Sequence, residues 1–488
     1  MGGHAGGHPC GGPVGRLPVH GRRRHPRPPF RCGGRRARPA RRLGGGARRR
    51  GPGAGREGEP PARRGDRLLR GAHVSTGLAF IADDFTGASD TLGVLGRAGH
   101  KVRLHLDLPG RGYDGIAGVA TALRSMGPGE IRPEVRRLAA GLIARGARVL
   151  HYKVCSTFDS SPEIGSIGAA AEGFRAAFRH AGAGEPLIAV IGGQPGLGRY
   201  CHHGTLFAAA ADGAVHRIDR HPVMARHPVT PMKEADLRRH LAAQGLDGLA
   251  LIDERDLAAT PLKALAAARA AGARRMLFDL GRNDDLPALR LALEALAAEA
   301  PLVCIGPSSV MEALRPPRAA PPAPEPAPRA RPVLLFAGSR SALTDAQVAA
   351  ASRFRLVPVS PVALCAGGAE AAAEAEAALG QGENVLLRLT AEGGHGRSGA
   401  EIAAASARLV AGLCGTGAAG ALAIAGGDTS SLAMRALAPE AIEYVRDVDP
   451  GVSLCRATGS GPAAGLPLIL KGGQMGRPDL FDRLVDAM

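Results

Sequence analysis

Short apolar runs, each closed by a polar or glycine-rich turn, recur along most of this chain. The first spans residues 78–82, and a stretch of helical spacing over 88–98 follows it. Buried strands of parallel sheets carry such unbroken runs because both of their faces are covered. Further runs occupy 148–153, 187–192, 249–253, 276–279, 302–306, 333–337, 383–389, 421–425 and 466–470, with Ala-rich helical stretches between them. This alternation predicts an α/β fold with mainly parallel sheets.

A change of composition divides the pattern into two parts. Residues 317–331 are almost entirely Pro, Ala and charged side chains, which is typical of a semi-rigid linker. We therefore expect two α/β domains, 75–316 and 332–488, each built on a mainly parallel sheet.

The first 74 residues do not share the pattern. They are rich in Arg, Gly and Pro and hold too few apolar side chains to offset the entropy cost of ordering, which predicts a disordered tail. Such a low-complexity segment is equally compatible with an over-extended gene model, and RNA binding is a third reading. The segment lacks the apolar stretch of a secretory signal.

The net charge of +18 belongs mainly to this tail. Residues 1–73 contain 19 arginines, no lysine and three acidic residues, so the rest of the chain is nearly neutral. Nucleic-acid binding by the folded part would need a basic face there, and we expect none. The eight cysteines form no CxxC pair, and no apolar run reaches the roughly 18 residues of a membrane span. These features favour a cytoplasmic protein with reduced thiols and no membrane partner.

Two glycine-rich turns in the C-terminal part carry the strongest functional signal. Residues 426–431 (GGDTSS) follow the run 421–425 and open a helix that we expect Thr429 or Ser430 to cap. Residues 471–476 (KGGQMG) follow the run 466–470. Glycines let a backbone approach a ligand closely, and free N–H groups at a helix start favour an anion. The pair of turns predicts a nucleotide-phosphate site.

A third turn of this kind follows the run 333–337. It holds Ser339 and opens another helical stretch, which is again compatible with phosphate. The chain has neither a GxxxxGK[ST] loop nor a full GxGxxG, so neither familiar nucleotide fingerprint applies.

Two carboxylates, Asp83 and Asp84, end the first strand. Ligands of open α/β sheets bind at this edge, where a carboxylate can accept a hydroxyl proton or hold Mg²⁺. Neighbouring side chains here should point apart, so only one should face a substrate. The alternative without a catalytic role is that one carboxylate caps the next helix and the other is solvated.

A polar loop at 151–161 (HYKVCSTFDSS) ends another strand and suits a small, hydroxylated, anionic ligand. The alternative is a hydroxyl-rich turn that satisfies its own backbone. Arg199, in a later turn, can fork onto a carboxylate. Cys201, His202 and His203 follow it, but no fourth ligand is visible at a suitable spacing, so we expect no metal held by these side chains.

Five blocks resemble those of one known family, in order over about residues 77–485. Residues 81–88 (IADDFTGA) are similar to its ADD-x-TGA block, 153–161 to KxCSTFDS and 227–232 (HPVTPM) to HPxxPM. The two C-terminal glycine turns are similar to its GGDTS and KGGQxG blocks. The chain resembles the four-carbon acid sugar kinases, and its CSTFDS variant resembles the 3-oxo-tetronate 4-kinase branch.

The resemblance implies an N-terminal domain that binds a four-carbon sugar acid and a C-terminal domain that binds ATP. It implies transfer of the γ-phosphoryl group to the terminal hydroxyl, with Asp83 on the sugar-acid side. Asp83 and Asp84 are both catalytic candidates, of which we expect Asp83 to face the substrate, and we expect Mg²⁺ to accompany ATP. The implied substrate ligands are Arg124, Lys153 and Asp159, to which we add Arg199. The implied ATP ligands are Ser339, Gly426, Gly427, Asp428, Thr429, Gly473 and Gly476.

Residues 193–200 (GQPGLGRY) depart from the stretch expected of the 3-oxo-tetronate branch. A threonate or erythronate kinase therefore stays open, as does a regulator that binds nucleotide or sugar acid without turnover. A homo-oligomer is compatible with either reading.

Overall fold

The computed structural model describes residues 77–110, 115–210, 212–227, 229–318, 332–390, 396–449, 451–473 and 475–488. All of these belong to one compact unit, Gly71–Met488. The expectations for the tail 1–74 and for most of the linker 317–331 lie outside the described residues.

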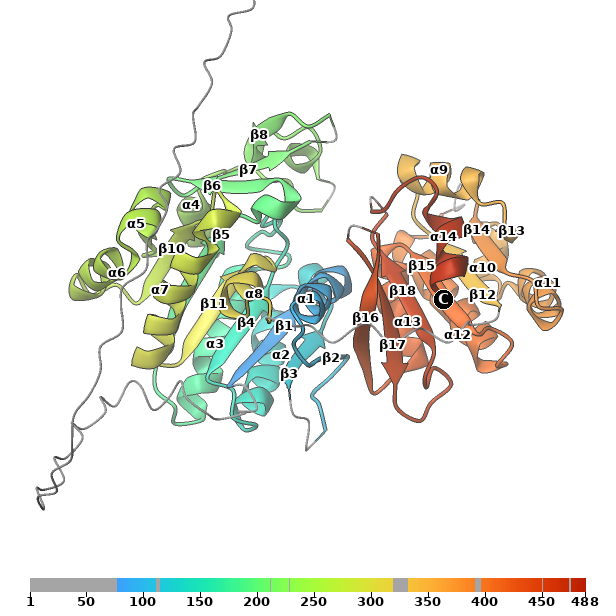
Figure 1. Cartoon of the computed structure of the whole chain (residues 1–488), viewed down its shortest axis with the longest axis horizontal. Coiled ribbons are helices and arrows are strands. Elements are labelled where there is room, and N and C mark those ends of the chain that lie inside the picture. Colours follow the sequence, from blue (N-terminus) through green and yellow to red (C-terminus); the bar gives the residue numbers. More distant parts are fainter. Residues whose placement is uncertain are drawn as a thin grey trace, which may run out of the picture. The chain divides into compact units, whose positions relative to one another are not determined.

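A 15-stranded sheet runs through the described part of the chain (Figure 1), in the order β13-β14-β12-β15-β18-β17-β16-β2-β3-β1-β4-β11-β5-β10-β9. The strands of the N-terminal part are β1 (Leu78–Ala82), β2 (Val102–His105), β3 (Ile116–Ala120), β4 (Val149–Lys153), β5 (Leu187–Gly192), β9 (Ala250–Ile252), β10 (Arg275–Asp279) and β11 (Leu302–Gly306). Those of the C-terminal part are β12 (Val333–Ala337), β13 (Arg355–Val359), β14 (Val385–Leu389), β15 (Ala421–Ala425), β16 (Ala441–Asp449), β17 (Val452–Thr458) and β18 (Pro467–Lys471).

Parallel pairing dominates, as the sequence predicts. The strands from β2 to β9 pair in parallel, and so do those from β13 to β18. The antiparallel pairs are β18–β17, β17–β16 and β16–β2. The last of these joins the sheets of the two parts edge to edge, with Leu104 opposite Ile442 and Arg103 opposite Glu443.

Helices cover both faces of this sheet. They are α1 (Phe85–Arg97), α2 (Pro128–Ile143), α3 (Ile167–His180), α4 (Leu237–Ala242), α5 (Glu254–Ala259), α6 (Pro261–Ala270), α7 (Leu286–Glu299), α8 (Ser309–Leu314), α9 (Ala342–Ala350), α10 (Pro361–Cys365), α11 (Ala369–Gly380), α12 (Gly399–Gly415), α13 (Gly427–Leu437) and α14 (Leu480–Ala487). None of the helices in the described ranges is long and apolar enough to cross a membrane.

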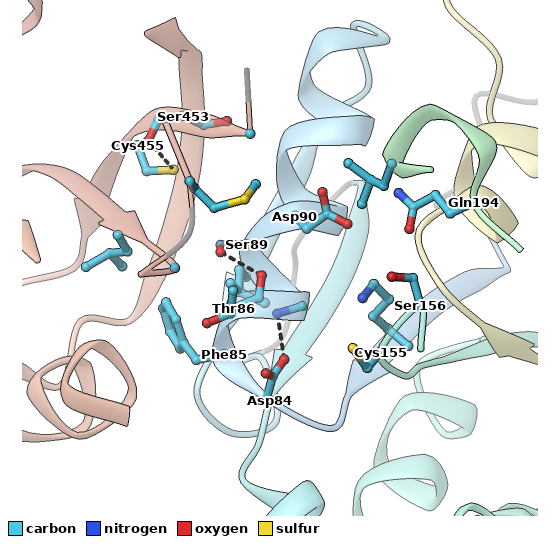
Figure 2. A pocket seen from close by; sticks show the side chains of 18 of the residues that line it. Asp84, Phe85, Thr86, Ser89, Asp90, Cys155, Ser156, Gln194, Ser453 and Cys455 are labelled. Carbon is cyan, nitrogen blue, oxygen red and sulfur yellow. Dashed lines mark hydrogen bonds between the residues drawn. The ribbon is translucent and has the colours of Figure 1, made fainter. Parts of the chain in front are cut away.

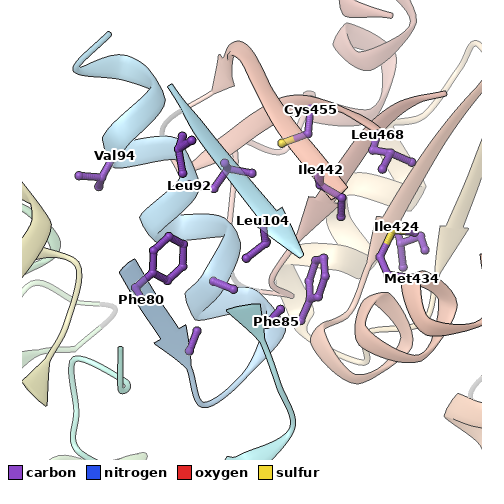
Figure 3. Packing of buried hydrophobic residues seen from close by; sticks show 14 of the residues in the cluster. Phe80, Phe85, Leu92, Val94, Leu104, Ile424, Met434, Ile442, Cys455 and Leu468 are labelled. Carbon is purple, nitrogen blue, oxygen red and sulfur yellow. The ribbon is translucent and has the colours of Figure 1, made fainter. Parts of the chain in front are cut away.

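Alternate residues of each central strand belong to different cores. In β1, Phe80 packs with α1, α7 and α13 residues in one cluster, while Ile81 packs with α2 and α3 residues in another. Figure 3 shows the first cluster running from Phe80 through Leu104 to Ile442 in the C-terminal part. A strand buried on both faces cannot alternate apolar with polar residues, which explains the unbroken apolar runs.

The expected strands at 78–82, 187–192, 302–306, 333–337 and 421–425 coincide with β1, β5, β11, β12 and β15. The sequence pattern missed β3, whose Gly118 weakens a strand signal. A Cβ at this position would overlap the ring of Phe80, so the glycine makes room for that side chain. The pattern also missed the antiparallel pair β16–β17 and a small sheet of β6 (Arg199–His202), β7 (Thr205–Ala209) and β8 (Val215–Arg217).

Candidate functional site

A cavity of about 240 Å³, here cavity A, opens at the carboxyl ends of β1, β4 and β5. Its polar lining side chains are Asp84, Thr86, Ser89, Asp90, Arg97, Arg124, Lys153, Cys155, Ser156, Gln194, Ser453 and Cys455. Figure 2 shows Asp84, Asp90, Ser156 and Gln194 arranged around this space, with Ser453 and Cys455 on its far side. The turns after three parallel strands thus converge on one polar cavity.

Arg124 ties the two adjacent carboxylates together. Its Nε and Nη2 donate to Asp83 at 3.0 and 2.8 Å, and its Nη1 lies 2.8 Å from Oδ2 of Asp84. The expectation that these two carboxylates point apart is wrong, because Asp84 leaves the strand to become the N-cap of α1. There it accepts from the N–H of Gly87 at 2.6 Å. Asp84 and Arg124 line cavity A, whereas Asp83, the carboxylate expected to face the substrate, is buried and does not.

The environment of Asp83 changes its protonation. Burial raises the pKa of Asp83 to about 6, against the lowering effect of the Arg124 charge. Burial also works to raise the pKa of Asp159, but Arg124 and hydrogen bonds from Cys155 and Thr157 hold it below its ordinary value. Asp83 therefore titrates near neutrality while Asp159 stays ionised.

Lys153 brings a second cation to the cavity from the end of β4. It is buried, and its Nζ donates to the carbonyl oxygen of Val154 at 3.1 Å. A Cβ on Gly87 would lie 2.9 Å from this Nζ, so the glycine lets the lysine approach the start of α1. Lys153 and Arg124 thus bring two cations to the wall of cavity A, beside the carboxylates of Asp84 and Asp90 in the same lining.

The remaining candidate residues, in the loop after β4 and at Arg199, contribute less to the lining of cavity A. Cys155 lines cavity A, but burial raises the pKa of its thiol to about 11, so it is protonated at neutral pH. Asp159 accepts from Oγ1 of Thr157 at 2.7 Å and does not line the cavity. Arg199 does not line it either, since its Nη1 donates to the carbonyl of Leu197.

A second cavity of about 470 Å³, here cavity B, lies among the glycine-rich turns. Its lining residues are Gly338, Ser339, Arg340, Leu389, Arg397, Gly399, Ile402, Ala403, Ser406, Gly426, Gly427, Thr429 and Gly473. Five of the sequence-predicted nucleotide residues are among them. Gly476 is not, and Asp428 lies in the first turn of α13.

The start of α13 differs from the expected cap. The helix begins at Gly427 with Gly426 as its N-cap, so Thr429 and Ser430 lie inside its first turn and cap nothing. Gly426 has φ +144°, a conformation that only glycine adopts easily, and it provides no side chain to bond the first N–H groups. Such N–H groups are available to an anion.

The turns around cavity B hold one another in place. The N–H groups of Gly338 and Ser339 donate to the carbonyl of Ala425 at 3.0 and 2.9 Å. Ser341 and Thr344 donate to the carbonyl of Gly473 at 2.6 and 3.1 Å. A Cβ on Gly473 would overlap the hydroxyl of Ser339. These turns are therefore held together before any ligand enters, and a side chain at Gly473 would not fit among them.

Thr86, at the start of α1, is where the two cavities adjoin. Thr86 lines cavity A and Gly427 lines cavity B. A Cβ on Gly427 would lie 2.9 Å from Oγ1 of Thr86, and one on Gly472 would lie 3.7 Å from its Cγ2. The N-termini of α1 and α13 thus meet between the cavities.

Sequence reasoning missed several lining residues. Thr86 stood within the recognised ADD-x-TGA block, and Arg340 lies beside Ser339, so both had a local signal. Gln194 lies in the segment 193–200 that departs from the related branch, whereas Asp90 had no signal, because only the fold brings it to cavity A. Within the described ranges, no three His, Cys, Asp or Glu side chains are grouped to hold a metal ion.

Two family models match different parts of this chain. Residues 78–314 match a family model described as a sugar-binding N-terminal domain, and residues 334–481 match one described as a nucleotide-binding C-terminal domain. The 3-oxo-isoapionate kinase of Paraburkholderia graminis is 34% identical, covering 83% of this chain and 93% of its own length. The 3-oxo-tetronate kinase of Cupriavidus necator is 32% identical, covering 83% and 95%.

Solved structures share the fold. The Haemophilus influenzae protein HI1011 superposes with a TM-score of 0.66 at 22% identity, covering 84% of this chain and 99% of its own. A Salmonella typhimurium LT2 protein with a provisional tRNA synthase name gives a TM-score of 0.68 at 24% identity, covering 83% and 98%.

Proposed function

We propose that this chain, which belongs to the four-carbon acid sugar kinase family, transfers the γ-phosphoryl group of ATP to a hydroxyl of a four-carbon sugar acid. The observation that carries the proposal is the junction at Thr86. An acid-attracting cavity and a glycine-lined cavity adjoin there. Phosphoryl transfer requires donor and acceptor within about 3–3.5 Å of each other, and it depends on positioning and charge neutralisation more than on covalent catalysis.

Cavity A suits the sugar acid. Arg124 and Lys153 face the substrate carboxylate with charge-assisted hydrogen bonds. Asp84 lines the same space two residues before Thr86, so it accepts the proton of the attacking hydroxyl. Asp83, behind Arg124, holds that guanidinium with two hydrogen bonds and acts as a positioning residue.

Cavity B suits the phosphates of ATP. The N–H groups at the start of α13 and the hydroxyl of Ser339 are the donors for the phosphates, and Arg340 adds positive charge. Bound Mg²⁺ supplies charge neutralisation at the phosphates and keeps several water ligands, so it needs few protein oxygens. The glycines at 426, 427 and 473 keep this space open.

For the acceptor, we propose a 3-oxo-tetronate, the four-carbon acid named for one curated relative, and the branched five-carbon 3-oxo-isoapionate named for the other is the alternative. The departure at 193–200 bears on this choice, because Gln194 and Leu197 of that segment line cavity A.

The test is ADP release with Mg²⁺ and each acid in turn: 3-oxo-isoapionate, 3-oxo-tetronates, threonates and erythronates. We expect turnover on at least one 3-oxo acid, with ADP and phosphorylated acid formed in equal amounts. A folded protein that turns over none of them, yet binds acid and nucleotide by calorimetry, would be a binding regulator instead.

A further inference from the structure

The side chain of Gln194 lines cavity A with an unused hydrogen-bond acceptor. The residue is 3% exposed, and its Oε1 has no partner among the described residues. Other buried side-chain atoms in the described part also lack partners, but none of those residues lines cavity A or cavity B. Buried polar atoms are nearly always satisfied, so an orphan acceptor in a ligand cavity points to a donor on the ligand.

The backbone holds Gln194 in one place. Its N–H donates to the carbonyl of Arg199 at 2.9 Å, and its carbonyl accepts from the N–H of Leu197 at 2.9 Å. The preceding Gly193 has φ +104°, a Cβ there would overlap the carbonyl of Leu280, and its own carbonyl accepts from Ser309 at 2.8 Å. The carboxamide is therefore preorganised, which is what a specificity contact requires.

The lining of cavity A contains both hydrogen-bond donors and hydrogen-bond acceptors. Arg124 and Lys153 are donors that suit a carboxylate. Asp90 accepts a hydrogen bond from Ser308, so Gln194 carries the unpaired acceptor among the described residues of this lining. Figure 2 places Gln194 across the cavity from Cys455 of the C-terminal part, with Asp90 between them.

Resting on the proposed function, we propose that Oε1 of Gln194 accepts a hydrogen bond from a substrate hydroxyl other than the one that is phosphorylated. This contact makes Gln194 a specificity-determining residue, which selects hydroxylated acids over their deoxy analogues. A site built around such a contact discriminates strongly, because the analogue leaves the buried acceptor unpaired.

The experiment compares wild type with Gln194→Met, which keeps the length of the side chain and removes the amide. Both proteins are given the best acid from the ADP-release screen and its series of single-deoxy analogues. With the full acid, we expect kcat/KM of Gln194→Met to be about 10- to 100-fold lower than that of wild type. With one deoxy analogue, we expect the two proteins to differ by no more than about twofold. An equal loss with every acid would mean a structural role and would overturn the proposal.

Gln244→Met is the matched control. Gln244 is also a buried glutamine, but its Oε1 accepts from the N–H of Ile167 at 2.7 Å and its Nε2 donates to Ser160 at 2.9 Å. This variant should lower the melting temperature and leave the ratio between the acids unchanged. If it changes the ratio as Gln194→Met does, the discrimination does not belong to Gln194.

If Gln194→Met folds poorly, a second variant still tests the proposal. Gln194→Glu keeps an acceptor oxygen, so it should keep the preference for the hydroxylated acid while raising KM through repulsion of the substrate carboxylate. Loss of the preference would count against the proposal. If wild type turns over no acid, the kinase proposal fails, and calorimetry with the same acids and variants still decides the role of Gln194.

Discussion

At the scale of single residues, two adjacent carboxylates with the same chemistry occupy different positions. Asp84 lines the cavity and caps α1, whereas Asp83 is buried behind Arg124. Asn caps a helix about as well as Asp, so Asp84→Asn should keep the cap and lose only the ion pair with Arg124. If Asp84 takes the hydroxyl proton, kcat should fall by roughly 10²–10⁴. Asp83→Asn should instead raise KM more than it lowers kcat, because it loosens Arg124.

Steady-state kinetics and melting curves of both variants check this assignment. Wild-type turnover in both would mean that neither carboxylate takes part, and the base would then be sought between Lys153 and Asp159. A kcat loss in Asp83→Asn alone would reverse the two roles.

The raised pKa of Asp83 also makes stability depend on pH. Its folded-state pKa of about 6 lies above the ordinary value of 3.8, so the folded state prefers the protonated form. The contribution is fully present below about pH 4 and is lost as pH rises through 6, and it amounts to roughly 3 kcal/mol. Urea unfolding at several pH values should show this decline in wild type and not in Asp83→Asn. Parallel curves for the two proteins would contradict it.

The residue scale is also where sequence reasoning stopped short. The glycines and Ser339 were found because a turn after an apolar run has a local signature. Asp90 lies in the middle of α1, and Gln194 follows β5, so nothing near them in the sequence marks them as neighbours. Their proximity depends on strand order, which a single sequence does not encode locally.

At the scale of elements, the start of α13 is the feature most open to test. Gly427→Val places a branched side chain where a Cβ alone would lie 2.9 Å from Oγ1 of Thr86. It should obstruct the junction and displace phosphate from the N–H groups, which costs on the order of 3 kcal/mol, or about a hundredfold in rate. Calorimetry should show weakened ATP binding and nearly unchanged sugar-acid binding.

Gly412→Val in α12 is the matched control, because that glycine is exposed and a Cβ there meets nothing within 4 Å. It should bind both ligands like wild type. Equal weakening of ATP and sugar acid by Gly427→Val, or global unfolding, would remove the support for a dedicated nucleotide site at α13.

The elements themselves were predictable where burial fixes the pattern. β1, β5, β11, β12 and β15 are covered on both faces, so their apolar runs mark them in the sequence. The antiparallel strands β16 and β17 carry charged and half-exposed residues, which removes that signal. Their pairing with β18 and β2 is a tertiary outcome.

At the scale of the whole molecule, the first strand begins at Leu78 and the sugar-binding match begins at the same residue. We expect that deletion of residues 1–74 leaves folding and turnover intact, because their composition cannot support a packed core. Melting temperature and kcat of the full chain and the truncated chain provide the comparison. A large loss in either quantity would show that the N-terminal segment contributes to the active protein.

The pairing of β2 with β16 has a consequence for biosynthesis. The bonded residues Arg103 and Glu443 lie 340 positions apart. At synthesis rates of about 5–20 residues per second, β2 is made roughly 20–70 s before β16, the strand that pairs with its outer edge. An unpaired strand edge invites association with other chains, and short, charged edges resist it. β2 has only four residues, with Lys101 directly before it and Arg103 within it. Its exposed edge should therefore resist association with other chains during this interval.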